Sequence, residues 1–441
     1  MKKHTQSPYE SSEISYKPSG IKWLGEIPQS WKNVSIRSCF TESNQRCNTD
    51  SYPLLSVTIA NGIIYQDDIE NKKDISNDDK SNYKIVPLNA VAYNKMRMWQ
   101  GAVGVNTLTT GIVSPAYIVA IPNEKILPNF VSYLFKSKIM ISEFDKNSYG
   151  LCLDMNNLRY DDFRNIKIPL PPLQEQKEIA EFLDSKCEKI QNYIDKKQKL
   201  ITLLQEKKQA LINEAVTKGL NPNIESKNSG IDYLGLIPHH WEVTNLKNIV
   251  SIKSGGTPSR DNKDYWNGDI PWIRSEFCHN QHIFQCDVKE KITTLGLQKS
   301  SAKMCEKNTI LIALVGATIG QVAFLNFKSA INQNIAAIYP NNAAILDNVF
   351  LFFVALTFKQ RFEILGKYAI ANLAFIGNLK IPLPPLQEQK QIANFLDKKC
   401  KKIDIVIEKT KKQIKLIKEY KNTLINEAVC GRINLQKKER I

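Results

Sequence analysis

The chain has 441 residues, enough for two or three domains that each bury a core of their own. Its apolar fraction of 42% and charged fraction of 24% exclude a disordered or fibrous protein, and its formal net charge of +16 favours an acidic partner such as nucleic acid. Its nine cysteines form no Cys-x-x-Cys pair, which predicts free thiols. With no signal peptide and no membrane-spanning run in the sequence, we expect a cytoplasmic protein without a membrane partner.

The first recognisable element is a short motif that occurs twice. Residues 19–28 (SGIKWLGEIP) return as residues 229–238 (SGIDYLGLIP), and a tryptophan follows each copy, Trp31 in the first and Trp241 in the second. We call this stretch the SGI motif. A longer repeat further along the chain has nearly the same offset, so the chain is a tandem duplication with halves of about 210 residues.

Each half continues with a mixed region in which short apolar runs alternate with turn signals. The runs at 54–59, 90–93 and 309–315 predict β-strands, and helices are expected at 128–142 and 346–365. These patterns predict two α+β domains.

The two mixed regions share a layout but little sequence, which indicates a common frame carrying two different readers. Arginine can donate two hydrogen bonds to guanine, asparagine and glutamine pair with adenine, and lysine favours phosphate. The candidates for DNA contact are Asn94, Lys95, Arg97, Trp99 and Gln100 in the first region, and Thr257, Ser259, Arg260, Lys263, Arg274 and Ser275 in the second. Solvated surface side chains and neutral drift between the copies are the simpler alternative.

The longer repeat begins with a decapeptide, residues 168–177 (IPLPPLQEQK), which returns unchanged as residues 381–390. The match continues without a gap, and the segments 168–190 and 381–403 differ at only four positions. Prolines can precede a helix but not lie inside one, and neither Pro nor Gly follows until Gly219. Both copies therefore predict a helix of about 45 residues, roughly 65 Å long.

Apolar residues recur with a heptad period in both long segments, which predicts a coiled coil. Four positions interrupt the seam: Lys197, Lys208, Thr410 and Lys421. Each copy supplies the other with a matching apolar stripe, so we expect the two helices to pair antiparallel within one chain. Packing of each helix on its own domain, or pairing between two chains, are the alternatives.

The predicted fold class is α+β, with two domains joined by two long helices that form an antiparallel coiled coil, in a pseudo-two-fold tandem repeat. The expected segments are a first domain (1–167), a first helix (168–222), a second domain (223–380), a second helix (381–435) and a basic tail (436–441). The first domain ends in a longer segment, 154–163, before its decapeptide. We therefore expect the two domains to differ at their base.

Motifs of enzymes are mostly absent from the sequence, which has no P-loop, no Gly-x-Gly-x-x-Gly and no Asn-Pro-Pro-aromatic run. Four residues faintly resemble a nuclease carboxylate–lysine set: Asp67, Asp68, Glu70 and Lys72. A solvated acidic loop is the simpler interpretation. Four others lie close enough in sequence to suggest zinc: Cys278, His279, His282 and Cys286. Their spacing matches no standard zinc site, so we expect no bound metal.

The doubled decapeptide and the twin SGI motifs resemble the specificity subunit of type I restriction–modification systems, over almost the whole chain. The stretch 255–259 (GGTPS), with Tyr265, Trp266 and residues 270–273, fits the same family. The resemblance implies that both are target-recognition domains, that each reads one half of a split, asymmetric DNA site, and that the coiled coil sets the spacer. It implies no catalytic residue and no cofactor on this chain, with S-adenosylmethionine, ATP and Mg on partner subunits. The expected partners are double-stranded DNA, two methyltransferase subunits and restriction subunits, acting in host defence.

Because the decapeptide is identical in both copies, we expect it to dock two copies of one partner. The docking candidates are Pro171, Pro172, Leu173, Gln174 and Gln176, with Pro384, Pro385, Leu386, Gln387 and Gln389 in the second copy. Two rival hypotheses are a self-contained methyltransferase or nuclease, and a coiled-coil adaptor without DNA specificity.

Overall fold

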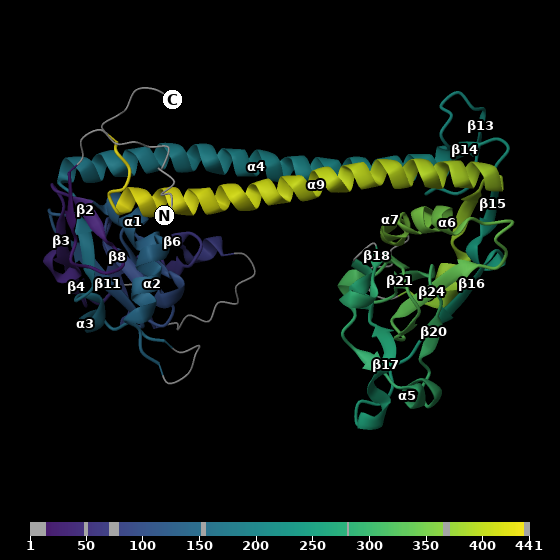
Figure 1. Ribbon diagram of the computed structural model, residues 1–441, viewed down its shortest axis with the longest axis horizontal. Coiled ribbons are helices and arrows are strands. Elements are labelled where there is room, and N and C mark those ends of the chain that lie inside the picture. Colours follow the sequence, from purple (N-terminus) through teal and green to yellow (C-terminus); the bar gives the residue numbers. More distant parts are fainter. Residues whose placement is uncertain are drawn as a thin grey trace, which may run out of the picture. The chain divides into compact units, whose positions relative to one another are not determined.

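The computed structural model describes residues 15–47, 52–69, 79–150, 156–279, 282–364 and 371–435. The chain forms two compact units. The first unit contains Met1–Lys197 together with Lys412–Ile441, and the second contains Gln198–Lys411 (Figure 1). Both unit boundaries fall inside the long helices, so each unit holds one mixed domain and a part of each helix.

The first unit opens with a hairpin formed by the SGI motif, and its main sheet lies beyond. The hairpin joins β1 (Tyr16–Pro18) to β2 (Glu26–Pro28). The main sheet has the order β4-β11-β8-β9, and every neighbouring pair is antiparallel. Its strands are β4 (Phe40–Ser43), β11 (Tyr117–Pro122), β8 (Val91–Asn94) and β9 (Val103–Val105). Two further pairs join β5 (Leu55–Thr58) to β6 (Gly62–Tyr65) and β7 (Lys84–Val86) to β10 (Gly111–Val113).

The second unit repeats this plan. Its SGI motif forms the hairpin of β13 (Ser226–Asn228) and β14 (Leu236–Pro238). Its larger sheet has the order β16-β24-β21-β22-β18, from β16 (Val250–Ser254), β24 (Ile335–Pro340), β21 (Ile310–Ala313), β22 (Val322–Leu325) and β18 (His282–Ile283). The first four strands match β4-β11-β8-β9 in order and direction. The predicted common frame is therefore confirmed, and so are the strands expected at 54–59, 90–93 and 309–315.

A second sheet distinguishes the second unit. It has the order β19-β17-β23-β20, from β19 (Lys291–Ile292), β17 (Trp266–Ile273), β23 (Ser329–Ile331) and β20 (Lys303–Cys305). The short helix α5 (Thr294–Gln298) lies beside β17, with the 3-10 turns η5 (Lys263–Tyr265) and η6 (Ser275–His279) before and after that strand. Most of the residues proposed to contact DNA in the second domain lie around this sheet.

The helical structure expected at 128–142 and 346–365 is confirmed, and each stretch contains two helices. The segment 128–142 contains α1 (Pro128–Lys136) and α2 (Lys138–Lys146), because Ser137 is extended and its hydroxyl accepts the Met140 N–H to cap α2. The segment 346–365 contains α6 (Asn348–Ala355) and α7 (Phe358–Ile364). The sequence did not reveal either break, because apolar residues continue on both sides of it.

At the base of the two domains the described elements follow the same order, while residues 154–155 of the segment 154–163 lie outside the described residues. The first domain ends in α3 (Tyr160–Phe163) followed by β12 (Lys167–Leu170), and the second ends in α8 (Leu373–Asn378) followed by β25 (Lys380–Leu383). The strand β12 pairs antiparallel with β3 (Lys32–Ser35), and β25 pairs in the same way with β15 (Glu242–Asn245). The first residues of each decapeptide thus form a strand of the preceding domain rather than part of the long helix.

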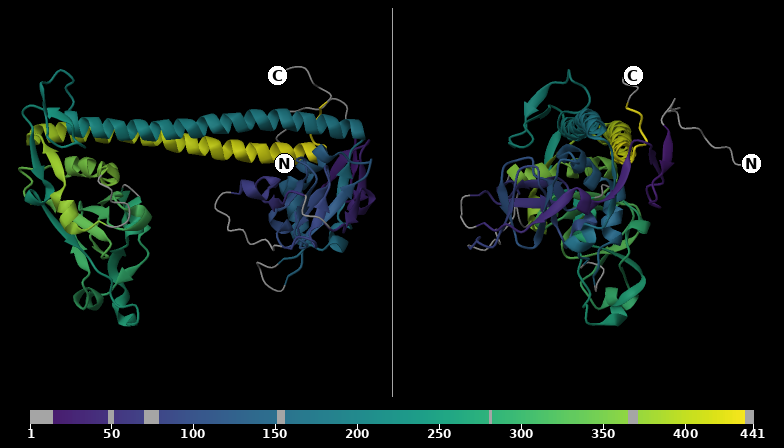
Figure 2. Two further views of the ribbon diagram at one scale, coloured as in Figure 1. Left: turned by 180° about the vertical axis from the view of Figure 1, so that it is seen from behind. Right: turned by 90° about the vertical axis from the view of Figure 1, so that its left-hand side faces the viewer.

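The long helices are α4 (Leu173–Lys218) and α9 (Leu386–Val429), and each begins directly after the last proline of its decapeptide. The helices α4 and α9 lie side by side in all three views (Figures 1 and 2). In the second unit both carboxylate oxygens of Asp404 accept from Lys208 Nζ at 2.8 Å. In the first unit Tyr193 of α4 and Leu416 of α9 line one pocket. Along α4 the residue number increases from Tyr193 to Lys208, while the number of the facing residue on α9 decreases from Leu416 to Asp404. The pair is therefore antiparallel and lies within one chain, as predicted.

The helix ends also pack on the domains, which was one of the alternatives. In the second unit one core contains Ile212 and Val216 of α4, Ile392 and Leu396 of α9, and the buried Trp241. Burial of such side chains contributes about 1.5–3 kcal/mol each to folding. No helix within the described residues is long and apolar enough to span a membrane.

Candidate functional site

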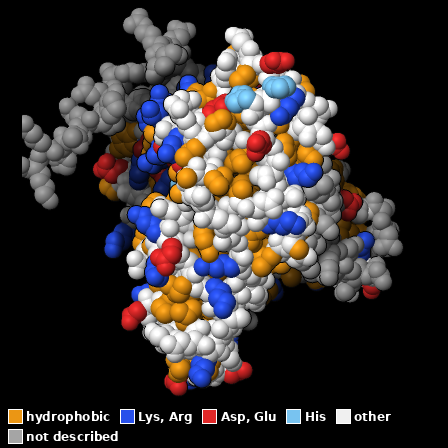
Figure 3. All heavy atoms as spheres, turned by 90° about the vertical axis from the view of Figure 1, so that its right-hand side faces the viewer, with side chains coloured by type: hydrophobic (Ala, Val, Ile, Leu, Met, Phe, Trp, Pro, Cys, Tyr) orange, Lys and Arg blue, Asp and Glu red, His pale blue; other side chains and the backbone are white. Residues whose placement is uncertain are grey.

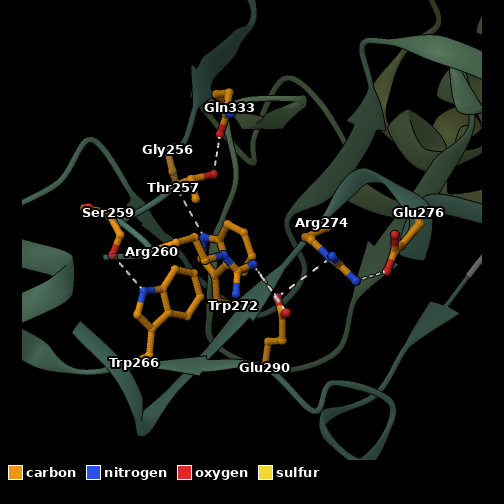
Figure 4. Close-up of polar contacts among 10 residues, drawn as sticks. All are labelled: Gly256, Thr257, Ser259, Arg260, Trp266, Trp272, Arg274, Glu276, Glu290 and Gln333. Atoms are coloured by element: carbon orange, nitrogen blue, oxygen red, sulfur yellow. Dashed lines mark hydrogen bonds and ion pairs between the residues drawn. The ribbon is translucent and has the colours of Figure 1, made fainter. Parts of the chain in front are cut away.

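The candidate site in the second domain is a cluster of two tryptophans, two arginines and their carboxylate partners (Figure 4). The loop that follows β16 supplies Gly256, Thr257, Ser259 and Arg260, while β17 supplies Trp266 and Trp272. Three more residues complete it: Arg274 and Glu276 after β17, and Glu290 before β19. Four of the six candidates predicted for this domain, Thr257, Ser259, Arg260 and Arg274, therefore come together.

The two tryptophans form the floor of this cluster. Trp272 is only 1% exposed, and its indole N–H donates to Gly256 O at 3.0 Å. The indole N–H of Trp266 donates to Ser259 O at 2.9 Å, and the two rings meet edge to face with centroids 5.2 Å apart. A Cβ on Gly256 would lie 1.9 Å from Ser301 Oγ, so only glycine fits there. The carbonyls of Gly256 and Ser259 thus each accept a hydrogen bond from a buried or half-buried tryptophan.

Each arginine in the cluster has a carboxylate partner. The Arg260 guanidinium lies 3.9 Å from the centroid of the Trp266 ring, and its Nη2 lies 3.3 Å from both oxygens of Glu290. Arg274 pairs through Nη2 with Glu276, and its Nε lies 3.7 Å from Glu290 Oε2. Glu290 lies between the two arginines. It was not predicted, because it stands in a polar stretch far from Arg260 along the chain and no spacing marks it.

The other candidates of the second domain are less engaged. Thr257 Oγ1 donates to Gln333 Oε1 at 2.6 Å, which ties the loop to the turn between β23 and β24. Lys263 is exposed in η5, and Ser275 is half-buried at the start of η6. On the face drawn in Figure 3, Lys and Arg side chains alternate with acidic and apolar ones instead of forming one basic patch.

The five candidates of the first domain follow one another at the end of β8 and in the 3-10 turn η3 (Met98–Gln100). The Asn94 side chain accepts the Met96 N–H at 3.0 Å, and the Trp99 indole donates to Met96 O at 3.1 Å. Arg97 is exposed and forms no ion pair with the described part of the chain. Hydrogen bonds to its own backbone therefore order the loop 94–101, and the guanidinium of Arg97 stays exposed to solvent.

A residue outside the prediction, Lys136 of α1, holds this loop in place. Its ammonium donates to three backbone carbonyls, Ile59 O at 2.7 Å, Gly101 O at 3.1 Å and Thr58 O at 3.2 Å. Burial lowers the pKa of Lys136 to about 8. Thr58 and Ile59 come from the β5–β6 turn, so one side chain joins that turn to the end of the loop 94–101.

The decapeptide is partly buried, so only some of the predicted docking residues are accessible in this structure. The Gln176 amide accepts the Leu127 N–H at 2.7 Å and donates to Lys125 O and Pro171 O. Gln389 makes the same three bonds, from Asp347 N and to Ile345 O and Pro384 O. Both side chains are 0% exposed. These two glutamines, and the buried Pro171 and Pro384, hold the helix start against the domain and are closed to a partner.

The SGI motifs are joined to the same helix starts, which the sequence did not reveal. The Trp31 indole donates to Glu175 Oε2 at 2.6 Å, and the Trp241 indole donates to Glu388 Oε2 at 3.1 Å. His240 Nε2 lies 2.9 Å from the same oxygen of Glu388. In each unit the tryptophan after the SGI motif therefore contacts the glutamate of the decapeptide, Trp31 with Glu175 and Trp241 with Glu388. We call this contact the joint. Six decapeptide candidates remain exposed or half-exposed: Pro172, Leu173, Gln174, Pro385, Leu386 and Gln387.

The described residues of the two weak metal patterns do not come together as a site. Cys278 is buried while His279 is exposed, and the ring of His282 packs on Phe324 and Phe352. Asp67 and Asp68 lie in the 3-10 turn η2 (Gln66–Asp68), whereas Glu70 and Lys72, like the basic tail 436–441, lie outside the described residues. Over the described ranges, no group of three or more His, Cys, Asp or Glu side chains is placed to hold a metal.

The fold and the sites define a two-domain recognition scaffold, with unlike loops on one frame and two matching helix starts. The model of the type I restriction modification DNA specificity domain matches residues 28–203 and again residues 238–416. These matches cover most of the chain, which belongs to this family. It is therefore a DNA specificity subunit, the non-catalytic member of a type I restriction–modification system.

The most similar curated relatives include two from Methanocaldococcus jannaschii. One, whose name assigns it to the specificity subunit of the type I restriction enzyme MjaX, is 27% identical over 94% of this chain and 96% of its own length. The MjaVIII specificity subunit is 29% identical over 74% of this chain and 75% of its own.

Two solved structures share the fold. One, from work on complex assembly and conformational transition of the type I R-M system, has a TM-score of 0.70 at 16% identity and covers 92% of this chain and 99% of its own. The HsdS subunit from Thermoanaerobacter tengcongensis has a TM-score of 0.50 at 18% identity, over 92% of this chain and 98% of its own.

Proposed function

We propose that the two domains of this specificity subunit, within the predicted bounds 1–167 and 223–380, read the two unlike halves of one split DNA site. The observation that carries the proposal is a single frame with different basic loops. In the first domain the candidates lie between β8 and β9. The equivalent loop of the second domain, 314–321 between β21 and β22, contains neither Lys nor Arg. There the arginines gather around β17 instead, so the two domains present different chemistry to DNA.

We further propose that the helix starts dock two copies of a methyltransferase subunit. The exposed Pro172, Leu173 and Gln174 recur as Pro385, Leu386 and Gln387 at the same place on an equivalent joint. Exposed apolar side chains of the long helices recur as well. Tyr193 and Leu416 are 42% and 64% exposed in the first unit. Their counterparts in the other copy of the repeat, Val406 and Leu203, are 44% and 51% exposed in the second unit. A surface presented twice suits two copies of one partner.

The remaining parts of the proposal concern the assembly. Restriction subunits would complete a complex that acts on DNA in the cytoplasm. S-adenosylmethionine, ATP and Mg would be bound by the partner subunits, since this chain is the non-catalytic member. No observation in the described residues favours a self-contained enzyme or an adaptor without DNA specificity.

The proposal is tested by sequencing the methylome of cells that express working partner subunits, with this gene present, deleted and restored. We expect one modified motif, made of two short halves around a fixed spacer, to vanish on deletion and return on restoration. A methylome that does not change would refute the proposal. Methylation or cleavage by the purified chain alone would instead support the enzyme hypothesis.

A further inference from the structure

We propose that Arg260 reads a guanine in the half-site of the second domain and that Glu290 is the residue that positions it. This inference rests on the proposed function and adds the residue and the base. It starts from Figure 4, in which Arg260 and Glu290 lie beside the two tryptophans.

The Arg260 fork is fixed before DNA arrives. Its guanidinium stacks on Trp266, whose indole N–H is held by the carbonyl of Ser259, one residue before Arg260 itself. Trp266 rests in turn on the buried Trp272. Because the loop, the ring and the arginine constrain one another, Arg260 loses little conformational freedom when it binds a base.

The fork also keeps donors free for a ligand. Only Nη2 of Arg260 bonds to Glu290, and the Arg260 side chain is 53% exposed. Guanine offers two adjacent acceptors, O6 and N7, in the major groove, and a planar arginine fork matches them. Glu290 offsets the positive charge of Arg260 and so weakens its attraction to phosphates. A neutralised but oriented fork suits a base edge better than the DNA backbone.

Arg274 has a different role, although the sequence made it an equal candidate. It pairs with both Glu276 and Glu290, and its Nε is buried without a hydrogen bond in the described structure. With two carboxylates around it, Arg274 is a positioning residue that holds Glu290 toward Arg260. We therefore assign base reading to Arg260 alone of this pair.

The decisive variant is Arg260→Lys, which keeps the positive charge over Trp266 but lacks the fork. We expect the preference for guanine at one position of the second half-site to fall by roughly 5- to 150-fold, with the first half-site unchanged. The measurement combines methylome sequencing with competition binding by the assembled complex, using duplexes that replace each base pair of the half-site in turn. Arg164→Lys is the matched control, because Arg164 forms an exposed ion pair with Asp161 in the first domain. It should leave both halves unchanged.

A second variant, Glu290→Gln, tests the positioning role. The preferred base stays the same, but discrimination at that position falls because the carboxylate of Glu290 no longer holds the Arg260 guanidinium in place. The positive charge of Arg260, no longer offset by Glu290, strengthens binding to non-specific DNA. The slope of log K against log salt concentration becomes steeper by about the amount expected for one additional phosphate contact. A merely structural Glu290 would not change that salt slope, and thermal unfolding of both variants shows whether the domain still folds.

The outcomes separate this inference from the proposed function. If the wild-type complex modifies no two-part motif, the proposed function fails. If the motif is present but Arg260→Lys changes no position, changes a position other than a G·C pair, or changes the first half, the assignment of Arg260 is overturned. An unchanged salt slope in Glu290→Gln overturns the role given to Glu290.

Discussion

Lys136 shows how one half-buried charge can hold a candidate reading loop in place. Its ammonium is surrounded by three backbone carbonyls, and no carboxylate in the described chain pairs with it. Hydrogen bonds from a charged donor contribute about 1.5–3 kcal/mol, while removal of the donor leaves partly buried carbonyls unsatisfied. The loop 94–101 and the β5–β6 turn therefore depend on this side chain for their relative position.

We expect Lys136→Met to lower the free energy of unfolding by about 1–3 kcal/mol and to weaken reading of the first half-site only. The pKa of Lys136 is about 8 in the folded protein against 10.5 for a free lysine. Between these values the unfolded chain binds more protons, so the stability contributed by Lys136 relative to methionine rises with pH from about 8 to 10.5. Denaturant unfolding of both forms across this range measures the difference. Lys136→Arg, which stays charged, serves as the control, and a difference independent of pH would contradict the assignment.

At the residue scale, sequence patterns nominated side chains but not their partners. Arg260 could be predicted because it follows a Gly-Gly-Thr-Pro-Ser loop. Glu290 and Lys136 could not, since the groups they contact are brought to them only by the fold. The burial of Gln176 and Gln389 could not be predicted for the same reason. A glutamine in a polar helix start suggests an exposed side chain, and only the tertiary carbonyls around it make burial favourable.

At the element scale, the decapeptide combines two functions in alternate residues. Prolines end the domain strand and allow the helix to begin, which is why α4 and α9 start at Leu173 and Leu386, inside the predicted segments 168–222 and 381–435. Gln389 faces inward, while Gln387, on the same first turn, remains exposed. The breaks after α1 and α6 could not be predicted, because a single Ser or Thr inside an apolar pattern is compatible with a continuous helix.

This division predicts opposite effects for two identical substitutions. Gln389→Leu removes three hydrogen bonds and leaves buried backbone groups unsatisfied, at about 1–3 kcal/mol for each group. The second domain should unfold at a clearly lower temperature in calorimetry. Gln387→Leu should leave the unfolding temperature unchanged but reduce binding of the methyltransferase subunit in a pull-down from a purified mixture. Equal unfolding temperatures of the two variants would show that the three hydrogen bonds of Gln389 do not stabilise the second domain.

At the scale of the whole molecule, duplication was the most predictable property. Two nearly equal offsets, one between the SGI motifs and one between the decapeptides, identified the repeat, and heptads identified the partner of each helix. The shared sheet order was beyond prediction, since the strands β4-β11-β8-β9 and β16-β24-β21-β22 have little sequence in common. What the repeat preserves is the joint where Trp31 meets Glu175 and Trp241 meets Glu388, and this joint fixes each domain on its helix start.

If the joints hold the domains on the helices, the helices should determine the spacer between the half-sites. Removing one heptad from α4 and the facing heptad from α9, counted outward from the Lys208–Asp404 pair, preserves the apolar seam. Loss of one heptad shortens a helix by about 10 Å, close to the rise of about three base pairs of DNA. We expect the modified motif to keep both half-sites and to lose about three base pairs of spacer, as read by methylome sequencing. Removing a heptad from α4 alone breaks the facing register and should abolish modification. A double deletion with an unaltered spacer would show that something other than the helices sets the distance.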